Sequence, residues 1–484
     1  SDVYKRQNAY KANCDSLSRR ITYLERELFR RSRKFRQSQR LKRITIDRIK
    51  ELLPANSVLI EYIRFRFLCP LGQTRETHYA VVIVENSGEP VVLDLGSAKR
   101  IDAAVAIYRD HMLNIAESKQ LPSRTDLAVY NSISRRLYSM ILEPIDSLIT
   151  TKDLIFVAPD GALNLVSFAG LKDCSGTYLV EKHAIQYLSS GRDLIRFTEP
   201  ERSGFGLIAF GDPDFDASRS ERLNALRQEH FEGSGNLISR SLPSSWNQLS
   251  SIHLYPLPAT RREIELVAKR WRETTGEPSL VYVGADASEE RFKRQASGKR
   301  VIHIATHGYY LSSNTSTDRQ LDRAVTAHQE NPLLLAGIFL AGANCSRLEA
   351  TRSSPDDPLG SSESVDDGIL TAYEVSTLNL EGTDLVVLSA CETGLGEIRD
   401  GEGVYGLRRA FQIAGARAVV SALWQVPDET TAEMMAHLYA STHATLPERI
   451  RAAQLEAINK LRTTNRCDHP FLWASFITIG DWHN

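Results

Sequence analysis

The pattern of apolar and polar positions divides the chain into strand-like and helix-like stretches. Three short stretches rich in β-branched and aromatic residues predict strands: VLIEYIRFRF (58–67), HYAVVIVEN (78–86) and PVVLDLG (90–96). Helical spacing of Ile, Leu and Tyr then predicts a helical pair over 101–148, followed by the strand DLIFVAPDG (153–161). Strands that alternate with long helices indicate an α/β fold with a mostly parallel sheet.

A second α/β block follows, and its pattern is clearer. Its predicted helices lie at 260–273, with Thr260 as N-cap, and at 286–297, 368–380, 404–415, 428–440 and 447–462. Its predicted strands lie at 279–284, 301–305 (VIHIA), 331–343, 384–391 (DLVVLSAC), 416–424 and 471–480. Three stretches rich in serine and charge predict irregular or mobile loops, namely 213–250, 311–330 and 345–366.

Length and composition narrow the class of protein. At 484 residues the chain is longer than one typical domain, so two or three units are expected. No stretch approaches the roughly 18–20 apolar residues of a membrane span, and no secretion signal is recognisable. The six cysteines are scattered without a CxxC pair, which argues against a disulfide framework or a zinc ribbon. We therefore expect a cytoplasmic protein with no membrane partner and no cofactor.

The net charge of −1 conceals a basic beginning. Residues 1–50 hold 16 Lys and Arg against 5 Asp and Glu. Ile21, Leu24, Leu28 and Phe29 fall near helical spacing among these charges, which favours a solvated helix that packs on the acidic remainder of the chain or on a missing neighbour. Nucleic-acid binding through residues 1–50 remains the alternative. The chain opens without Met, so we expect it to be part of a longer protein.

Two histidines four residues apart, His303 and His307, are the first candidates for chemistry. A zinc helix of the HExxH type needs a glutamate after the first histidine, whereas this stretch reads HIATH with β-branched flanks that favour a strand. Residues four apart in a strand are separated by about 13 Å, too far to bind one metal ion. His303 is therefore expected to be a hydrogen-bonded core residue. His307 lies at the carboxyl end of the strand, where open parallel sheets place reactive groups, and Gly308 lets backbone amides approach a substrate.

Cys391 ends another buried strand in the same way, with Gly394 and Gly396 behind it. A lone cysteine can be a small buried core residue. A cysteine and a histidine at the carboxyl ends of two strands can instead meet at one sheet edge, where the imidazole activates the thiol as a nucleophile.

GEGVYG (401–406) matches GxGxxG but does not begin at a strand end. A dinucleotide-binding loop requires that position, so a flexible loop that enters the next helix is the favoured interpretation.

Several long motifs, in order, resemble the CHAT family. They are VAPDGALNLVSFAGL (157–171), VIHIATHGYY, NPLLLAGIFLAGAN, DGILTAYEVSTLNLEGTDLVVLSACETGLGE, DGEGVYGLRRAFQIAGARAVVSALWQVPD and HPFLWASFITIGD. CHAT domains are caspase-like cysteine peptidases, similar to separases, caspases and metacaspases, and are often attached to tetratricopeptide repeats. The resemblance runs from about Leu53 to the end of the chain.

The resemblance implies a caspase-like, mostly parallel sheet flanked by helices and three regions. Residues 1–52 would be a basic helical segment or remnant of a repeat region, and 53–203 a non-catalytic α/β half similar to the pseudo-protease half of separases. Residues 204–484 would be the catalytic half. In GALNLVSF, Asn164 stands where family members often have His, which agrees with a supporting role for 53–203.

By resemblance, His307 and Cys391 are the catalytic pair, and the backbone amides of Gly308 and Cys391 form the oxyanion hole. The family pattern requires no third carboxylate and no metal. Metacaspases of Arg/Lys specificity carry an acidic residue two positions before the nucleophile, but here that position is Ser389. Basic specificity is therefore not supported at that position. Acidic residues that could line the substrate pocket from elsewhere are Glu392, Asp366, Asp367 and Asp400.

The expected function is a cysteine endopeptidase that cuts a specific protein in bacterial signalling, defence or cell death. The alternative is a catalytically silent scaffold that binds protein partners. An activating protein, or a partner bound to an N-terminal repeat region, could switch the enzyme on, and loop 345–366 could be displaced or cut on activation.

Overall fold

In this computed structural model the described residues are Arg20, 44–68, 75–198, 203–227, 253–311, 331–345, 366–390, 397–399, 403–425, 428–440 and 444–483. The element α3 (Ile46–Leu52) lies at the end of the basic segment, and the expected helix near Ile21 to Phe29 lies outside the described residues. No helix within these ranges has the length and apolar character needed to span a membrane.

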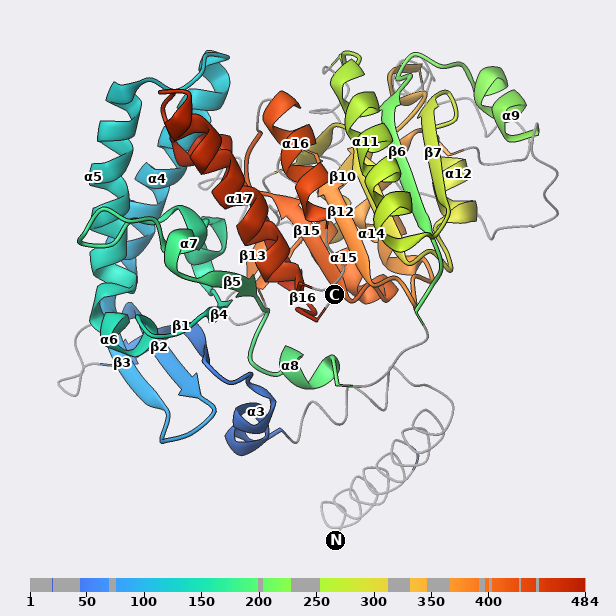
Figure 1. Ribbon diagram of the computed structural model, residues 1–484. Helices are drawn as coiled ribbons and strands as arrows, with labels where there is room; N and C mark the ends of the chain where they lie inside the picture. Colours follow the sequence, from blue (N-terminus) through green and yellow to red (C-terminus); the bar gives the residue numbers. More distant parts are fainter. Residues whose placement is uncertain are drawn as a thin grey trace, which may run out of the picture.

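One large sheet forms the centre of the described part of the chain (Figure 1). It has 11 strands in the order β3-β2-β1-β4-β5-β16-β15-β12-β8-β6-β7. Their bounds are β1 (Ser57–Leu68), β2 (Arg75–Glu85), β3 (Val91–Ser97), β4 (Leu154–Ala158), β5 (Ala184–Tyr187), β6 (Leu207–Pro213), β7 (Ser279–Gly284), β8 (Val301–Ala305), β12 (Leu385–Ser389), β15 (Ala418–Ala422) and β16 (Phe476–Gly480).

The sheet consists of two blocks that meet at β16. Strands β1, β4, β5 and β16 run parallel to one another, and β1, β2 and β3 form an antiparallel extension. Strands β15, β12, β8, β6 and β7 are also mutually parallel. Because β16 is antiparallel to β15, the two blocks run in opposite directions. The expected α/β fold with a large, mostly parallel sheet is confirmed.

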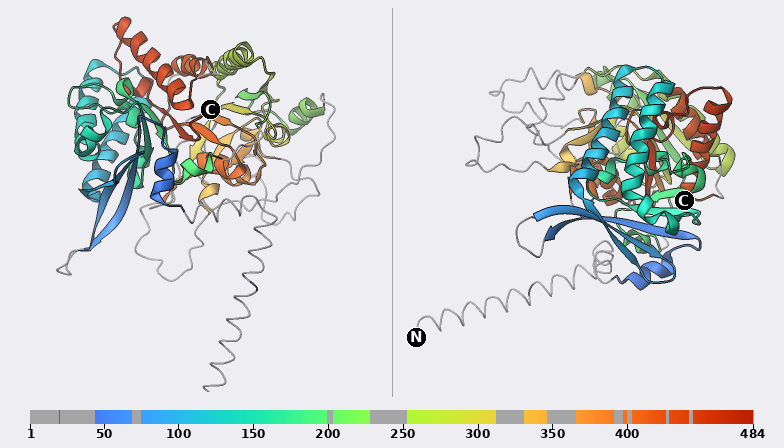
Figure 2. Two further views of the ribbon diagram at one scale, coloured as in Figure 1. Left: turned by 60° about the horizontal axis from the view of Figure 1, so that its bottom comes forward. Right: turned by 90° about the vertical axis from the view of Figure 1, so that its left-hand side faces the viewer.

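Helices cover the sheet on both faces (Figures 1 and 2). In the first block, α4 (Ala98–Ser118) and α5 (Arg124–Ile141) lie side by side. In the second, α11 (Pro258–Thr275), α16 (Asp428–Leu438) and α17 (Leu446–Thr463) contribute apolar side chains to the same core as Val387 of β12. The opposite face, which carries Val386 and Leu388, packs against α12 (Glu289–Gln295), α14 (Ala372–Thr377) and α15 (Leu407–Ala414). Successive β12 residues therefore point into two separate cores.

The smaller elements connect these layers. Strands β9 (Gly308–Tyr310), β10 (Ala336–Phe339) and β11 (Ile369–Thr371) form a second sheet, and β13 (Glu397–Arg399) pairs with β14 (Gly403–Tyr405). The remaining described helices are α6 (Asp146–Ile149), α7 (Leu179–Lys182), α8 (Asp193–Arg196), α9 (Arg219–Arg227) and the 3₁₀ turns η1 (Glu143–Ile145), η2 (Gly161–Leu165), η3 (Phe168–Gly170), η4 (Pro332–Leu334) and η5 (Pro470–Leu472).

Several details differ from the sequence prediction. Thr260 is not an N-cap, because α11 begins at Pro258 and its N-cap is Leu257. The Thr260 hydroxyl instead donates to the Leu257 carbonyl at 2.7 Å and accepts from the Asp212 amide at 2.8 Å. The stretch 331–343 forms a 3₁₀ turn and β10, which joins the second sheet rather than the central one. The helix expected at 404–415 begins only at Leu407, because β14 occupies the residues before it.

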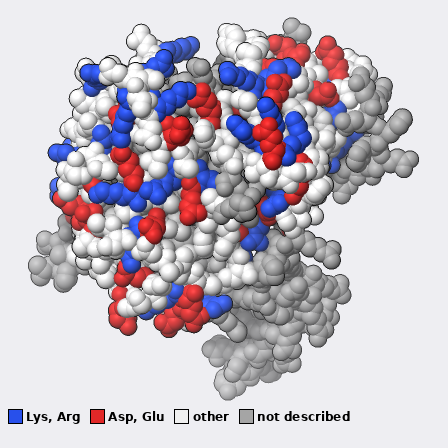
Figure 3. All heavy atoms as spheres, in the orientation of Figure 1, with Lys and Arg blue, Asp and Glu red and all other residues white. Residues whose placement is uncertain are grey.

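Acidic and basic side chains are interspersed on the face shown in Figure 3. Ion pairs at the surface of the described residues include one between Arg462 of α17 and Glu181 of α7 at 2.7 Å. Such partly exposed pairs add little to stability.

Candidate functional site

The stretch VIHIA forms β8, which lies between β12 and β6 and is buried along its whole length. His303 in its middle is fully buried. Its Nδ1 lies 3.1 Å from the Tyr439 hydroxyl, and its Nε2 lies 2.9 Å from Glu263 Oε1. Burial raises the pKa of Tyr439, so its hydroxyl keeps its proton. A carboxylate can only accept, so Nε2 of His303 donates to Glu263. The predicted hydrogen-bonded core histidine is confirmed.

His307 lies beyond the end of β8 and is only partly buried. Its backbone is anchored, because its carbonyl accepts from the Phe339 amide at 2.9 Å. Its ring Nε2 lies 3.1 Å from the Tyr255 carbonyl, and its ring centroid is 5.4 Å from that of Phe215. A carbonyl can only accept, so Nε2 carries the proton of this hydrogen bond. Nδ1 is consequently the ring nitrogen that can take a proton from a nucleophile.

Gly308 follows at the start of β9, and its position in the ladder determines where its amide points. The flanking bonds run from Phe339 N to His307 O and from Leu311 N to Leu335 O. Gly308 pairs with Ile338 between these positions. Hydrogen-bonded and non-hydrogen-bonded pairs alternate in an antiparallel ladder. The Gly308 amide therefore points away from β10, as a donor to an oxyanion must.

The end of β12 lies beside the end of β8. The two parallel strands pair from Leu385 with Val301 to Ser389 with Ala305. His307 and Cys391 each come two residues after this last pair. Cys391 itself lies outside the described residues, as do two of the expected pocket residues, Glu392 and Asp400.

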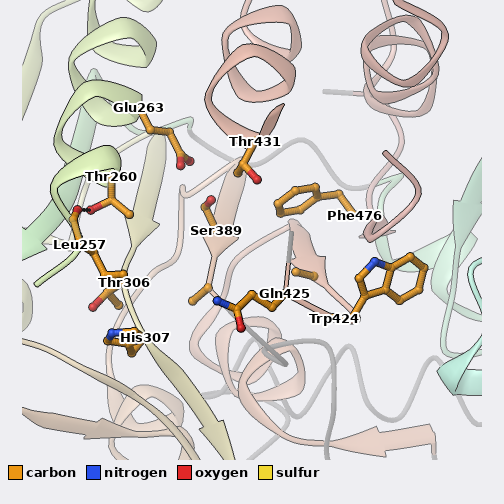
Figure 4. A pocket seen from close by; sticks show the side chains of 12 residues that line it. Leu257, Thr260, Glu263, Thr306, His307, Ser389, Trp424, Gln425, Thr431 and Phe476 are labelled. Carbon is orange, nitrogen blue, oxygen red and sulfur yellow. Dashed lines mark hydrogen bonds between the residues drawn. The ribbon is translucent and has the colours of Figure 1, made fainter. Parts of the chain in front are cut away.

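A cavity of about 50 Å³ begins at this edge of the sheet and extends beneath it (Figure 4). Six segments line it: the start of α11 (Leu257, Thr260, Glu263), the residues after β8 (Thr306, His307), the end of β12 (Ser389, Ala390), the end of β15 (Ala422, Trp424, Gln425), α16 (Thr431) and β16 (Phe476). The structure thus brings together His307 and the expected pocket residue Ser389.

Asp366 and Asp367 do not line this cavity. Asp366 accepts from Lys293 Nζ at 2.7 Å, and Asp367 accepts from the Ile369 amide at 2.9 Å. Lys293 also pairs with Glu289, which is fully buried and whose pKa burial raises well above its usual range. These carboxylates belong to an ionic cluster around α12, on the other side of the sheet from α11.

Sequence reasoning missed Glu263 as a pocket residue. Its signal was present in α11, where Ile264, Val267, Ala268 and Trp271 are buried at helical spacing and Glu263 lies on the same side of the helix. An acidic residue on the apolar side of a helix needs a buried partner. The sequence offered no way to identify His303, 40 residues away, as that partner.

Asn164 lies in the first block, away from this cavity. It is buried in the turn η2 and donates from Nδ2 to the carbonyls of Pro159 and Gly161, both at 3.2 Å. Its Oδ1 accepts from Arg408 of α15 at 3.2 Å. Burial lowers the pKa of Arg408 to about 10. Asn164 therefore connects the two blocks in the described structure.

The described part of the chain thus has a mixed α/β fold with a histidine at the carboxyl edge of a parallel sheet. A match to the CHAT domain family covers residues 131–481, and the chain belongs to that family. The family motifs recognised in the sequence are thereby confirmed, and they place the chain among proteins with a caspase-like cysteine peptidase fold.

Two similar relatives are tetratricopeptide repeat protein 28 of Mus musculus, 25% identical over 372 residues, and that of Homo sapiens, 26% identical over 368 residues. Each alignment covers 72% of this chain and 13% of the relative, so the chain spans a small part of these proteins. Among solved structures, the Saccharomyces cerevisiae separase–securin complex aligns over 90% of this chain and 30% of that chain. The sequence identity is 8% and the TM-score is 0.46.

Proposed function

We propose that this chain is a cysteine endopeptidase whose catalytic groups are His307 and Cys391. The observation that carries the proposal is the register of β8 and β12, which ends at Ala305 and Ser389, two residues before each group. Neighbouring strands lie about 4.8 Å apart. Groups that follow two such strands at the same level are within reach of a proton transfer from thiol to imidazole.

The described geometry supports a specific division of roles. The Tyr255 carbonyl accepts from Nε2 of His307 and so orients the ring, a role that a carboxylate has in other catalytic triads. Nδ1 takes the proton of the Cys391 thiol, and the thiolate attacks the scissile carbonyl carbon. The backbone amides of Gly308 and Cys391 stabilise the oxyanion. His307 then protonates the leaving amine, and water releases the acyl group from the sulfur.

We propose a specific protein as the substrate, in a bacterial signalling, defence or cell-death pathway within the cytoplasm. The relatives are named for tetratricopeptide repeats, which supports an activating partner bound by repeats outside residues 1–484. Within the described residues, Cys174 and Cys467 are thiols, as suits a reducing compartment.

Labelling with a weakly electrophilic peptidyl acyloxymethyl ketone tests the function. Intact mass should show one adduct on the wild type and none on Cys391→Ala or on His307→Gln. Cys467→Ala is the matched control and should still be labelled. Its thiol donates to the Ser123 carbonyl at 3.3 Å, away from the cavity, and burial raises its pKa. Equal labelling of Cys391→Ala, or no labelling of the wild type with or without an activator, would support the silent scaffold instead.

A further inference from the structure

The cavity that begins at His307 contains one fixed negative charge among its described lining residues. That charge belongs to Glu263, whose side chain is only 3% exposed. Figure 4 shows its carboxylate directed into the space between Ser389 and Thr431. Within the described chain its hydrogen-bond partner is His303, whose Nε2 lies 2.9 Å from Oε1. No lysine or arginine of the described residues pairs with the carboxylate, although a buried charge is normally paired.

The acidic end of the pocket lies further inside the protein than His307. Ser389 pairs with Ala305, two residues or about 6–7 Å inward from the level of His307. A peptide residue whose main chain lies beside His307 therefore needs a long side chain with a polar group at its end in order to reach Ser389 and Glu263. Ala422, Trp424 and Phe476 provide an apolar wall along the way, which suits the methylene stem of lysine or arginine.

We propose that Glu263 is the specificity-determining residue of the proposed peptidase, and that it selects lysine or arginine immediately before the scissile bond. The inference rests on the proposed function, because it assigns the cavity to the side chain that precedes the cut. The cation pairs with the Glu263 carboxylate, and the hydroxyls of Ser389 and Thr431 accept further hydrogen bonds from it. Glu263 on α11 thus supplies the negative charge that Ser389 lacks at its own position.

Matched fluorogenic peptides that differ only in the residue before the cut test the selection. Wild type should cleave after Lys or Arg at least about tenfold faster than after the neutral Gln or Met. Glu263→Gln keeps the shape and an acceptor for His303, and should lower kcat/KM for the basic peptides by roughly 30-fold or more. Its preference for the basic peptides over the Gln and Met peptides should disappear.

The control variant is Glu265→Gln, which removes a charge from the exposed side of the same helix and should leave all four rates unchanged. Equal cleavage after basic and neutral residues, or an unchanged preference in Glu263→Gln, would overturn the inference and leave the peptidase proposal intact.

A binding measurement separates the two proposals if no peptide is cut. Ligand-observed NMR on the Cys391→Ala protein should detect n-butylammonium or n-butylguanidinium, but not n-pentanol. The signal should disappear when Glu263→Gln is added to the same protein. Cation binding that depends on Glu263 supports the pocket even if peptidase activity is absent. Binding that is absent, or equal with and without Glu263, refutes it.

Discussion

At the scale of single residues, the site depends on buried polar groups that hold one another in place. Tyr439, His303 and Glu263 form a chain of hydrogen bonds from the end of α16, through β8, to α11. His303 has a hydrogen-bond partner at each ring nitrogen, so its ring orientation is determined. This chain keeps the Glu263 carboxylate at one position beneath the sheet edge.

Tyr439→Phe should destabilise the fold by about 1–2 kcal/mol, because it leaves Nδ1 of buried His303 without its hydrogen-bond partner. Urea denaturation of both proteins measures the difference. Tyr373→Phe removes a hydroxyl from a side chain that is 37% exposed and should change the free energy of unfolding by less than about 0.5 kcal/mol. Equal losses in the two variants would show that the Tyr439 hydroxyl has no special role.

The sequence already predicted that His303 and His307 lie in different environments. An apolar strand around His303 indicates burial, and the glycine after His307 indicates the end of a strand. Neither Glu263 nor Tyr439 could be identified from the sequence as a partner of His303. Glu263 is 40 residues and Tyr439 is 136 residues away from His303, and contacts at such separations leave no local sequence pattern. The predicted pairing of His307 with Cys391 remains a prediction.

At the scale of elements, the apolar runs located most of the strands because buried parallel strands have no polar alternation to conceal them. In the central sheet, strands β5 and β6 were missed, and both lie near less regular sequence. The run 331–343 was assigned to the central sheet because apolar composition does not specify which sheet a strand joins. Helix starts were less certain still, as Thr260 shows, since a threonine near a helix start can bond backward as well as cap.

Two glycines with positive φ allow backbone strain to be separated from steric clash. Gly480 at the end of β16 has φ +102°, and a Cβ there would lie 2.4 Å from the Arg417 carbonyl oxygen. Gly276 at the end of α11 has φ +71° and no atom within 4 Å of a Cβ. Gly276→Ala should cost about 1 kcal/mol from strain alone. Gly480→Ala should cost roughly 2–4 kcal/mol because the β16 backbone must also shift.

Thermal and urea unfolding of these two alanine variants provide the comparison. Similar losses of stability would mean that the end of β16 can relax away from Arg417, and that this junction is looser than its geometry indicates.

At the scale of the whole molecule, side-chain contacts join the helices of the first block to the segment that leads into β16. His111 on α4 faces His469, which precedes β16, with 3.1 Å between their Nε2 atoms. His469 Nδ1 accepts a hydrogen bond from the Phe471 amide, so the neutral ring of His469 carries its proton on Nε2. This Nε2 therefore donates to Nε2 of His111. Burial, aided by His111, lowers the pKa of His469 to about 3, and burial lowers that of His111.

Acidification should therefore weaken the fold. In the unfolded chain a histidine takes up a proton near pH 6.5, whereas folded His469 stays neutral down to about pH 3. Between these values the unfolded state binds more protons, so the free energy of unfolding falls as pH decreases, by up to about 1.4 kcal/mol per pH unit from this residue. Melting curves from pH 7 to pH 5 should show the decline.

His469→Asn keeps an acceptor for the Phe471 amide and removes the titrating group, so its stability should depend less on pH over this range. His437→Asn alters an exposed histidine and should keep the wild-type slope. A wild-type slope in His469→Asn would locate the pH dependence elsewhere.

The resemblance to the CHAT family predicted two α/β halves, and the division at residues 203 and 204 remains a prediction. The sequence order did not reveal that both halves share one sheet. Strand order across a sheet is determined by tertiary contacts, and a strand from the end of a chain can be inserted anywhere that its edges match.

The central position of β16 has a consequence for synthesis on the ribosome. Every other strand of the described sheet emerges earlier, and residues 423–475 must still be made after β15 is complete. Until residues 476–480 leave the exit tunnel, the nascent protein holds two half-sheets whose edges at β5 and β15 are open. Open edges pair readily with foreign strands, so translation that stalls in this interval would leave an aggregation-prone chain that a chaperone must protect.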